Sequence, residues 1–377
     1  MKTQTKLVIC HLCNFASPYK GNFMASLFYL EKKLEEANAD NKVIYIFYRN
    51  ASVCDWVKEM VQNNKRVYFF NDNRIKGILE LKRNLKNNNV NVLHLHFCFP
   101  MITLILLRLF CLNLQIILHF HMDVHSIPNS LINRLKHKTK TEIEKFICNH
   151  TVNKVCAVSE AVFNDLVKYK MHKNCSYIDN GIDFSRLDFK CEDGKKMYHL
   201  LDKKVAMIYG TAFHRKGVDI AIHAIKDIVN RYNLILMIIC QNKNYVLEQI
   251  KILLNEIPEW ILIVPSQENI PFYLKMSDVY LTPSRGEAFS YLMLESIYCG
   301  TPVIRSDYPG MNRGLPFDMV VSISDVTALQ KSIISVLSMT DVEKQAILSE
   351  QKEYIVKRWN IDIWSDKILK MYLQHIN

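Results

Sequence analysis

The sequence predicts an α/β protein built from two consecutive doubly wound domains. Short apolar runs alternate with longer amphipathic runs along the chain, and this alternation starts again after Gly181–Leu187. The length of 377 residues also exceeds the roughly 250–300 residues at which one hydrophobic core usually stops growing. Apolar strands between helices are typical of parallel sheets that helices cover on both faces. We expect one domain at residues 1–185 and a second at 186–358, with the linker near Asp183–Lys190.

In the first half, the predicted strands are Lys6–Cys13, Lys42–Tyr48, Val90–His96, Gln115–His121 and Lys154–Val158. A helix is expected at Asn22–Ala37, and another begins after Ser159, whose hydroxyl can cap a first turn. The most apolar stretch, Met101–Leu118, is about long enough to span a bilayer. Because Arg108 and other polar residues interrupt it, we interpret it as a buried helix followed by a buried strand.

In the second half, the predicted strands are Val205–Tyr209, Leu234–Cys240, Trp260–Val264 and Val279–Thr282. The predicted helices are Val218–Arg231, Asn244–Asn255, Pro271–Met276, about Phe289–Cys299, and Ile361–Gln374. Open parallel sheets bind ligands at the carboxyl ends of their strands, so we expect the site in the cleft between the domains.

Charge is distributed unevenly along the chain. Residues 1–185 hold 25 basic and 15 acidic residues, which accounts for +10 of the total +11. This half is either a basic soluble face or a surface for an anionic partner such as a membrane. No helix-turn-helix, finger or RNP-type pattern is present, so we expect no nucleic-acid partner.

The 11 cysteines mostly lie in apolar runs, which indicates reduced thiols and a cytoplasmic location. We expect no signal peptide, because Met1–Thr5 leads directly into a strand. Cys10 and Cys13 form a CxxC without a second pair, which favours a structural role over zinc binding. A dehydrogenase is disfavoured, because the loop from Asn14 to Gly21 contains one glycine where a dinucleotide-binding loop needs G-x-G-x-x-G.

The segment Ser284–Glu295 carries the most chemical information. A loop follows the strand that ends at Thr282, and a helix is expected near Phe289, with Glu287 at its mouth and Glu295 two turns inside. Eight helical residues rise about 12 Å, which is about the length of a diphosphate between a ribose and a sugar. The backbone N–H groups of Ser290, Tyr291 and Leu292 would then point at phosphates.

This segment resembles the E-x7-E motif of the family 4 retaining glycosyltransferases, which have the GT-B fold of two facing Rossmann-like domains. Further motifs resemble that family in the same order: Val158-Ser-Glu160, Asn180-Gly-Ile-Asp183, Lys216-Gly-Val-Asp219, Gly300-Thr-Pro-Val-Ile and Asp307-Tyr-Pro-Gly310. Residues 359–377 resemble the closing helix that crosses back to the N-terminal domain of these enzymes.

The resemblance implies a role for each matching residue. Glu287 and His121 would contact the donor sugar, Glu295 the ribose, and Lys216 the diphosphate. Gly21 would lie near the phosphates and the acceptor, and its neighbours Lys20 and Asn22 are assigned to the acceptor. Three further histidines, at positions 94, 96 and 119, are expected to be structural.

One position departs from the family pattern. The arginine that often follows the glycine of the strand ending at Gly210 is replaced by Thr211, so we expect Arg215 to supply the second phosphate cation. No D-x-D pair is present, and we expect neither a metal nor another cofactor. The negative charge of the leaving diphosphate must then be stabilised by cationic side chains and by backbone amides at a helix N-terminus.

The resemblance implies a retaining transferase that moves a sugar from a nucleotide sugar, with UDP preferred, to a glycan. The basic first half favours a lipid-linked oligosaccharide at the inner face of the plasma membrane, as in capsule or other surface polysaccharide assembly, with the run Arg134–Lys140 against anionic lipid. A non-hydrolysing nucleotide-sugar epimerase and a catalytically silent glycan-binding protein are the alternatives.

Overall fold

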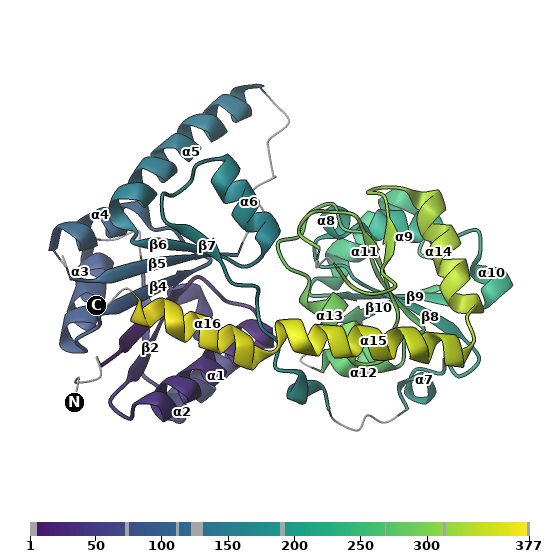
Figure 1. The fold of residues 1–377 in the computed structure, drawn as a ribbon. Helices are drawn as coiled ribbons and strands as arrows, with labels where there is room; N and C mark the ends of the chain where they lie inside the picture. The colour runs from purple at the N-terminus through teal and green to yellow at the C-terminus, as the bar shows by residue number, and fades with distance from the viewer. Residues whose placement is uncertain are drawn as a thin grey trace. The chain divides into compact units, whose positions relative to one another are not determined.

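The computed structural model describes residues 6–71, 75–110, 113–121, 131–188, 193–267, 269–311 and 314–374, with only the backbone for residues 131–138. Met1–Thr5 and most side chains of the basic run Arg134–Lys140 therefore lie outside the described residues. The chain divides into two compact units, Met1–Gly181 with Ile361–Asn377, and Ile182–Asn360. The sequence placed these divisions after residues 185 and 358. Each unit is an open parallel sheet flanked by helices (Figure 1).

The sheet of the first unit has the strand order β3-β2-β1-β4-β5-β6-β7, and all neighbouring pairs run parallel. Its strands are β1 (Val8–Cys13), β2 (Lys42–Tyr48), β3 (Val67–Phe70), β4 (Val92–His96), β5 (Gln115–Phe120), β6 (Lys154–Ala157) and β7 (Cys175–Tyr177). Its helices are α1 (Gly21–Ala37), α2 (Asp55–Gln62), α3 (Ile75–Asn87), α4 (Met101–Phe110), α5 (Leu131–Thr151), α6 (Glu160–Lys168) and α16 (Ile361–Leu373). A short 3-10 helix, Arg49–Val53, follows β2. This order reverses direction between β1 and β4, as in doubly wound folds.

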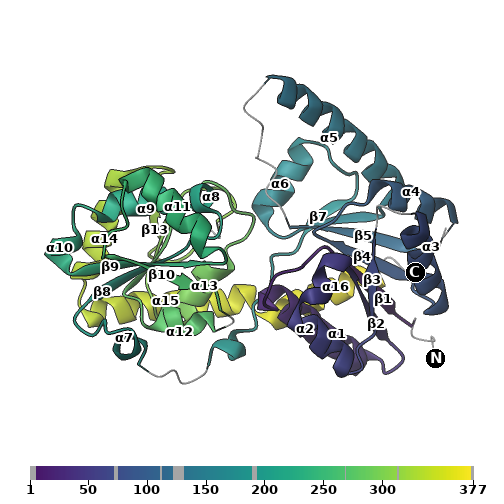
Figure 2. The same cartoon turned by 180° about the vertical axis from the view of Figure 1, so that it is seen from behind.

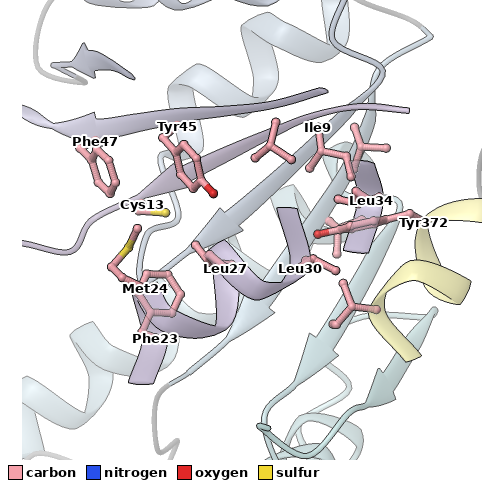
Figure 3. Close-up of a cluster of buried hydrophobic side chains, with 14 of the residues drawn as sticks. Ile9, Cys13, Phe23, Met24, Leu27, Leu30, Leu34, Tyr45, Phe47 and Tyr372 are labelled. Carbon is pink, nitrogen blue, oxygen red and sulfur yellow. The ribbon is translucent and has the colours of Figure 1, made fainter. Parts of the chain in front are cut away.

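Helices α1, α2 and α16 cover one face of this sheet, and α5 lies on the other side (Figures 1 and 2). The core between them includes Leu27 and Leu30 of α1 and Tyr372 of α16, all almost fully buried (Figure 3). Helix α16 is also held by polar contacts, because the Tyr29 hydroxyl donates to Asp362 at 2.6 Å and Lys33 contacts Asp366 at 2.8 Å. The last helix is therefore part of the first unit, although it follows the whole second unit in sequence.

The sheet of the second unit has the strand order β10-β9-β8-β11-β12-β13, again all parallel. Its strands are β8 (Lys204–Tyr209), β9 (Leu234–Cys240), β10 (Ile261–Pro265), β11 (Val279–Thr282), β12 (Val303–Ser306) and β13 (Met319–Val321). Its helices are α7 (Gly194–Met197), α8 (Phe213–Lys216), α9 (Val218–Ile225), α10 (Val229–Tyr232), α11 (Lys243–Leu254), α12 (Ile270–Lys275), α13 (Tyr291–Tyr298), α14 (Val326–Ser338) and α15 (Asp341–Trp359). A 3-10 helix, Phe184–Leu187, occupies part of the segment expected to be a linker. Two separate apolar cores lie on the two faces of the sheet.

Most predicted elements are present, with differences at helix ends. The side chain of Ser159 caps α6 by accepting a hydrogen bond from the backbone N–H of Val162, as expected. The helix predicted at Val218–Arg231 is interrupted and forms α9 and α10. The helix predicted from Phe289 begins two residues later, at Tyr291.

The apolar stretch Met101–Leu118 forms helix α4 and most of strand β5, as the sequence indicated. Among the described residues, no helix is long and apolar enough to cross a membrane. The expectation of a buried helix is wrong for one face of α4, because Ile102, Leu109 and Phe110 are each more than half exposed. A helix on the outside of a sheet buries one stripe only, and here the outer stripe is also apolar.

Candidate active site

The candidate site lies in the second unit, where the loops after β8 and β11 leave the carboxyl edge of the sheet. These two strands are neighbours at the point where the strand order reverses, which is where doubly wound sheets bind ligands. The loops contact each other directly, because the backbone N–H of Arg285 donates to the carbonyl of Arg215 at 2.8 Å. Residues far apart in sequence are thereby brought to one place.

Glu287 is the centre of this arrangement. The residue is 7% exposed, and its carboxylate accepts two hydrogen bonds from the Lys216 ammonium, at 2.7 and 2.9 Å. Arg215 donates to the same carboxylate at 3.2 Å and to the carbonyl of Gly286 at 2.9 Å. The Lys216 side chain is largely buried, whereas that of Arg215 is 53% exposed. The sequence assigned these three residues to the donor separately, and the structure brings them into one ion cluster.

Gly217 fixes the direction in which Lys216 leaves helix α8. Its φ of +73° lies in the left-handed region, and a Cβ there would lie 2.2 Å from the carbonyl oxygen of Pro283. Only glycine meets both conditions, so the turn after Lys216 packs against the loop that leads to Glu287. Thr211, where the family often has arginine, has an ordinary loop contact, since its hydroxyl accepts from the backbone N–H of Gln241 at 3.4 Å.

A second ion pair supports the same two loops. Arg285 donates through two nitrogens to the two oxygens of Asp219, each at 2.8 Å, and also to the carbonyl of His214 at 2.7 Å. Burial favours a higher pKa for Asp219, but hydrogen bonds and charge from Arg285 outweigh it and hold the pKa below its usual value. The fork-to-fork geometry holds the loop rigidly beside Glu287.

Helix α13 begins later than the sequence suggested, with Ser290 at its N-cap and Tyr291 as its first residue. Glu287 therefore lies in the loop before the helix and not at its mouth, and the 12 Å helical separation from Glu295 does not apply. The backbone N–H groups of Tyr291 and Leu292 are in the first turn, where no intrahelical acceptor exists. Such groups at a helix N-terminus can bind an anion.

Glu295 forms an ion pair with Arg186 that sequence reasoning missed. Glu295 is 3% exposed, and Arg186 reaches it from the 3-10 helix at Phe184–Leu187, 109 residues earlier. The Nε of Arg186 is buried and has no hydrogen-bond partner within the described residues. The only sequence signal was the motif Asn180-Gly-Ile-Asp183, which ends three residues before this arginine.

The remaining assigned residues lie in the first unit. Gly21 begins α1 with a φ of +53°, in the left-handed region where glycine is favoured. Lys20 forms an ion pair with Glu59 at 2.6 Å, and Asn22 is buried. The His121 ring packs on that of Phe23, with centroids 5.5 Å apart, so the start of α1 and the end of β5 are adjacent.

His121, directly after β5, belongs to a cluster with four histidines on β1, β4 and β5. Its Nε2 is 3.1 Å from Nδ1 of His96, whose other nitrogen is 3.1 Å from Nδ1 of His11. The cluster also includes His94 and His119, which stack with centroids 5.2 Å apart. Burial lowers the pKa of all five, to about 3 for His11 and His119, so the rings are neutral near pH 7. The sequence predicted structural roles for three of them but did not anticipate one cluster.

Comparison with known families agrees with this geometry. Residues 26–186 match the model described as Glycosyltransferase Family 4, and residues 192–354 match the model described as Glycosyl transferases group 1. Both models describe glycosyltransferases, each covers a little under half of the chain, and the two parallel-sheet units have the GT-B fold of that class. Within that class the chain is similar to family 4.

The related proteins have low sequence identity to this chain, and each match covers only part of both proteins. An N-acetyl-alpha-D-glucosaminyl L-malate synthase from Bacillus anthracis is 25% identical over 228 residues, which are 58% of each protein. The phosphatidylinositol N-acetylglucosaminyltransferase GPI3 subunit of Saccharomyces cerevisiae is 23% identical over 231 residues, 58% of this chain and 49% of that protein. The chain thus spans about half to three fifths of the length of these relatives.

Solved structures match over almost the full length. A glycosyltransferase from Rickettsia africae has a TM-score of 0.78 at 18% identity, covering 99% of this chain and 100% of that one. Anabaena HepE in complex with UDP-glucose has a TM-score of 0.75 at 15% identity, covering 97% and 99%. At these identities the likeness establishes the fold alone.

Proposed function

We propose that this protein is a retaining glycosyltransferase that transfers a sugar from a UDP-sugar to a lipid-linked glycan in surface polysaccharide assembly. The observation that carries the proposal is the cluster of Glu287, Lys216 and Arg215 at the carboxyl edge of the second sheet. A buried carboxylate with two adjacent cations, beside a helix N-terminus, suits a sugar joined to a diphosphate. The complex of Anabaena HepE with UDP-glucose supports the choice of nucleotide.

In the proposed reaction, the bond between the anomeric carbon and the diphosphate oxygen breaks, and the nucleoside diphosphate keeps the electron pair. Lys216, Arg215 and the first-turn amides of α13 stabilise this charge. The acceptor hydroxyl attacks from the same face and forms the new glycosidic bond, and its proton passes to the leaving phosphate. Glu287 and His121 orient the sugar, whose anomeric carbon becomes oxocarbenium-like.

The nucleoside is assigned to the Arg186–Glu295 pair. Glu295 would accept from ribose hydroxyls, and the buried Arg186 Nε, which lacks a partner within the described part of the chain, would donate to the nucleoside. Ribose contacts are similar in the ground and transition states, so they contribute to affinity more than to turnover. Gly21, with Lys20 and Asn22, is assigned to the acceptor side of the reaction.

The test is release of nucleoside diphosphate by purified protein from UDP-glucose, UDP-N-acetylglucosamine and GDP-mannose, with and without a lipid-linked acceptor fraction. We expect acceptor-dependent release from a UDP-sugar.

Lys216→Ala and Arg215→Ala should each cost about 2.7–4 kcal/mol of transition-state stabilisation. Arg215→Lys should restore only part of this stabilisation, since the point charge of an ammonium cannot replace the forked guanidinium group. Glu350→Gln, an exposed position on α15, is the matched control. Conversion of the donor sugar without acceptor would favour the epimerase, and binding without turnover the silent protein.

We also propose that the first unit docks on an anionic membrane through helix α4 and its basic neighbours. Ile102, Leu109 and Phe110 present apolar surface on α4, and the ammonium of Lys82 on α3 lies 4.2 Å from the Phe110 ring centroid. Burying one such side chain contributes about 1.5–3 kcal/mol, and each basic residue near anionic lipid about 1 kcal/mol. The +10 charge of residues 1–185 supports the same partner.

Co-sedimentation with liposomes tests this surface. Wild-type protein should sediment with vesicles that contain phosphatidylglycerol, less so at high salt, and weakly with phosphatidylcholine alone. Leu109→Glu should reduce binding, whereas Val342→Glu, an even more exposed apolar position on α15 of the second unit, should not. Equal loss in both variants, or no binding to either vesicle, would contradict the proposal.

A further inference from the structure

The histidine cluster of the first unit contains a set of nitrogen atoms arranged for a metal ion. His11 on β1 is the register partner of His94 on β4, and His96 on β4 is the partner of His119 on β5. Register partners point to the same face of a sheet, and residues two apart on one strand do so as well. Imidazoles therefore line one face of three adjacent strands.

Three of these rings are the best placed. Nitrogen atoms of His11, His94 and His96 lie within 4.8 Å of one another, and the ring centroids are 4.1–5.5 Å apart. The three residues are at most 1% exposed. A histidine binds a metal ion through the lone pair of its neutral ring.

Two nitrogen atoms in this set have nothing to bind. Nε2 of His11 and Nε2 of His94 are buried and lack a hydrogen-bond partner within the described residues. A buried polar atom without a partner carries a free-energy cost, and native structures retain few of them. A metal ion bound by these rings would give such a nitrogen a partner.

Tyr372 of α16 contacts His94, one of the three candidate metal ligands. Its hydroxyl lies 2.6 Å from Nδ1 of His94, the nitrogen on the far side of that ring from the unpaired Nε2. Metal-binding histidines usually donate their second N–H to an oxygen, which fixes the tautomer and the ring orientation. Figure 3 shows Tyr372 reaching from α16 into the core of this unit.

We propose that His11, His94 and His96 bind a first-row transition-metal dication, with Zn²⁺ the expected ion. Imidazole nitrogen suits such ions, and three histidines with an open fourth position form a known zinc geometry. The ion would join β1 to β4 beneath α16. This site is separate from the donor cluster around Glu287 and does not depend on the proposed transfer reaction.

A second set, His96, His119 and His121, shares one residue with the first. It is the weaker candidate because His121 is only half-buried and is assigned to the donor sugar. The two sets differ at His11 and His94 in the first and at His119 and His121 in the second. Substitution of these residues therefore distinguishes them.

The experiment uses the full chain after removal of any histidine tag and dialysis against chelator. Addition of Zn²⁺ alone should give one tightly held equivalent per chain by elemental analysis, together with a higher Tm. Co²⁺ should give the visible absorption of a site with nitrogen ligands. Tyr372→Phe keeps all three ligands and should weaken Zn²⁺ binding about 10–100-fold.

His94→Gln should abolish the tight equivalent, and His119→Gln should retain it. His150→Gln, an exposed histidine on α5, controls for surface binding. If His94→Gln does not fold, the affinity of the Tyr372→Phe variant decides. The proposal is overturned if wild-type protein gains neither bound Zn²⁺ nor thermal stability, if Tyr372→Phe binds as tightly as wild type, or if His119→Gln loses the ion while His94→Gln keeps it.

Discussion

Replacing Glu287 by glutamine should separate nucleotide affinity from turnover. Without donor, the Glu287 carboxylate neutralises Lys216 through hydrogen bonds of 2.7 and 2.9 Å and Arg215 through one of 3.2 Å. A diphosphate needs the same two cations. Glu287 therefore competes with the leaving group, and an isosteric neutral amide should release both cations for the nucleotide.

The magnitude follows from the contacts. A hydrogen bond to a charged group contributes about 1.5–3 kcal/mol net, and the bonds to Lys216 are the buried ones, whereas the half-exposed Arg215 adds little. Removing that competition should tighten UDP binding by about 10–100-fold, at about 1.4 kcal/mol per tenfold. Turnover should fall by a similar or larger factor, because the carboxylate no longer orients the sugar.

Isothermal titration of UDP into wild type, Glu287→Gln and the control Glu350→Gln measures the first effect, and steady-state kinetics measure the second. The Tm without nucleotide should fall, since Lys216 loses its buried partner, and saturating UDP should restore it. Unchanged or weaker UDP binding in Glu287→Gln would refute the reasoning, because it would mean that the ion cluster does not compete with the diphosphate.

Three further predictions concern the same unit. Arg186→Met should remove the cation that is ion-paired with the buried Glu295, cost about 3–5 kcal/mol of stability, and raise the KM for the donor more than it lowers kcat; an unchanged Tm in thermal unfolding would contradict this. Gly310→Ala should abolish activity, because its Cβ would overlap the backbone carbonyl of Glu287. Gly300→Ala has open space around its Cβ but a φ of +87°, so it should lose only about 1 kcal/mol of folding stability and stay active. Equal turnover in the two variants would contradict the close contact between Gly310 and Glu287. Adding Mg²⁺ or Mn²⁺ should not raise the transfer rate, since the sequence contains no D-x-D pair to hold either ion. A clear increase in the transfer rate would contradict this prediction.

Local patterns were sufficient to predict the fold. The strands Lys42–Tyr48, Leu234–Cys240 and Val279–Thr282 were predicted with the bounds that the structure has, because fully apolar runs of four to seven residues are typical of buried parallel strands. The cap at Ser159 was equally local. Helix ends were less certain: α13 begins at Tyr291, after the loop that carries Glu287 has packed against Gly310.

The partners of the candidate site were decided by tertiary structure. Sequence alone identified Glu287, Glu295, Lys216 and Arg215 as chemically important, since residue type and spacing are local properties. It could not show that Lys216 binds Glu287 across 71 residues or that Arg186 binds Glu295 across 109. Those contacts arise because parallel strands distant in the chain end at one edge of a sheet.

The histidines illustrate the same limit. Alternation within β4 puts His94 and His96 on one face, but only the β1-β4-β5 register brings in His11 and His119, and only the return of α16 at the end of the chain brings Tyr372 to His94. The sequence by itself determined the strands, the helices and the types of residue available for chemistry. Strand order and register decided which of those residues meet, because hydrogen bonding between strands joins segments that no local pattern connects.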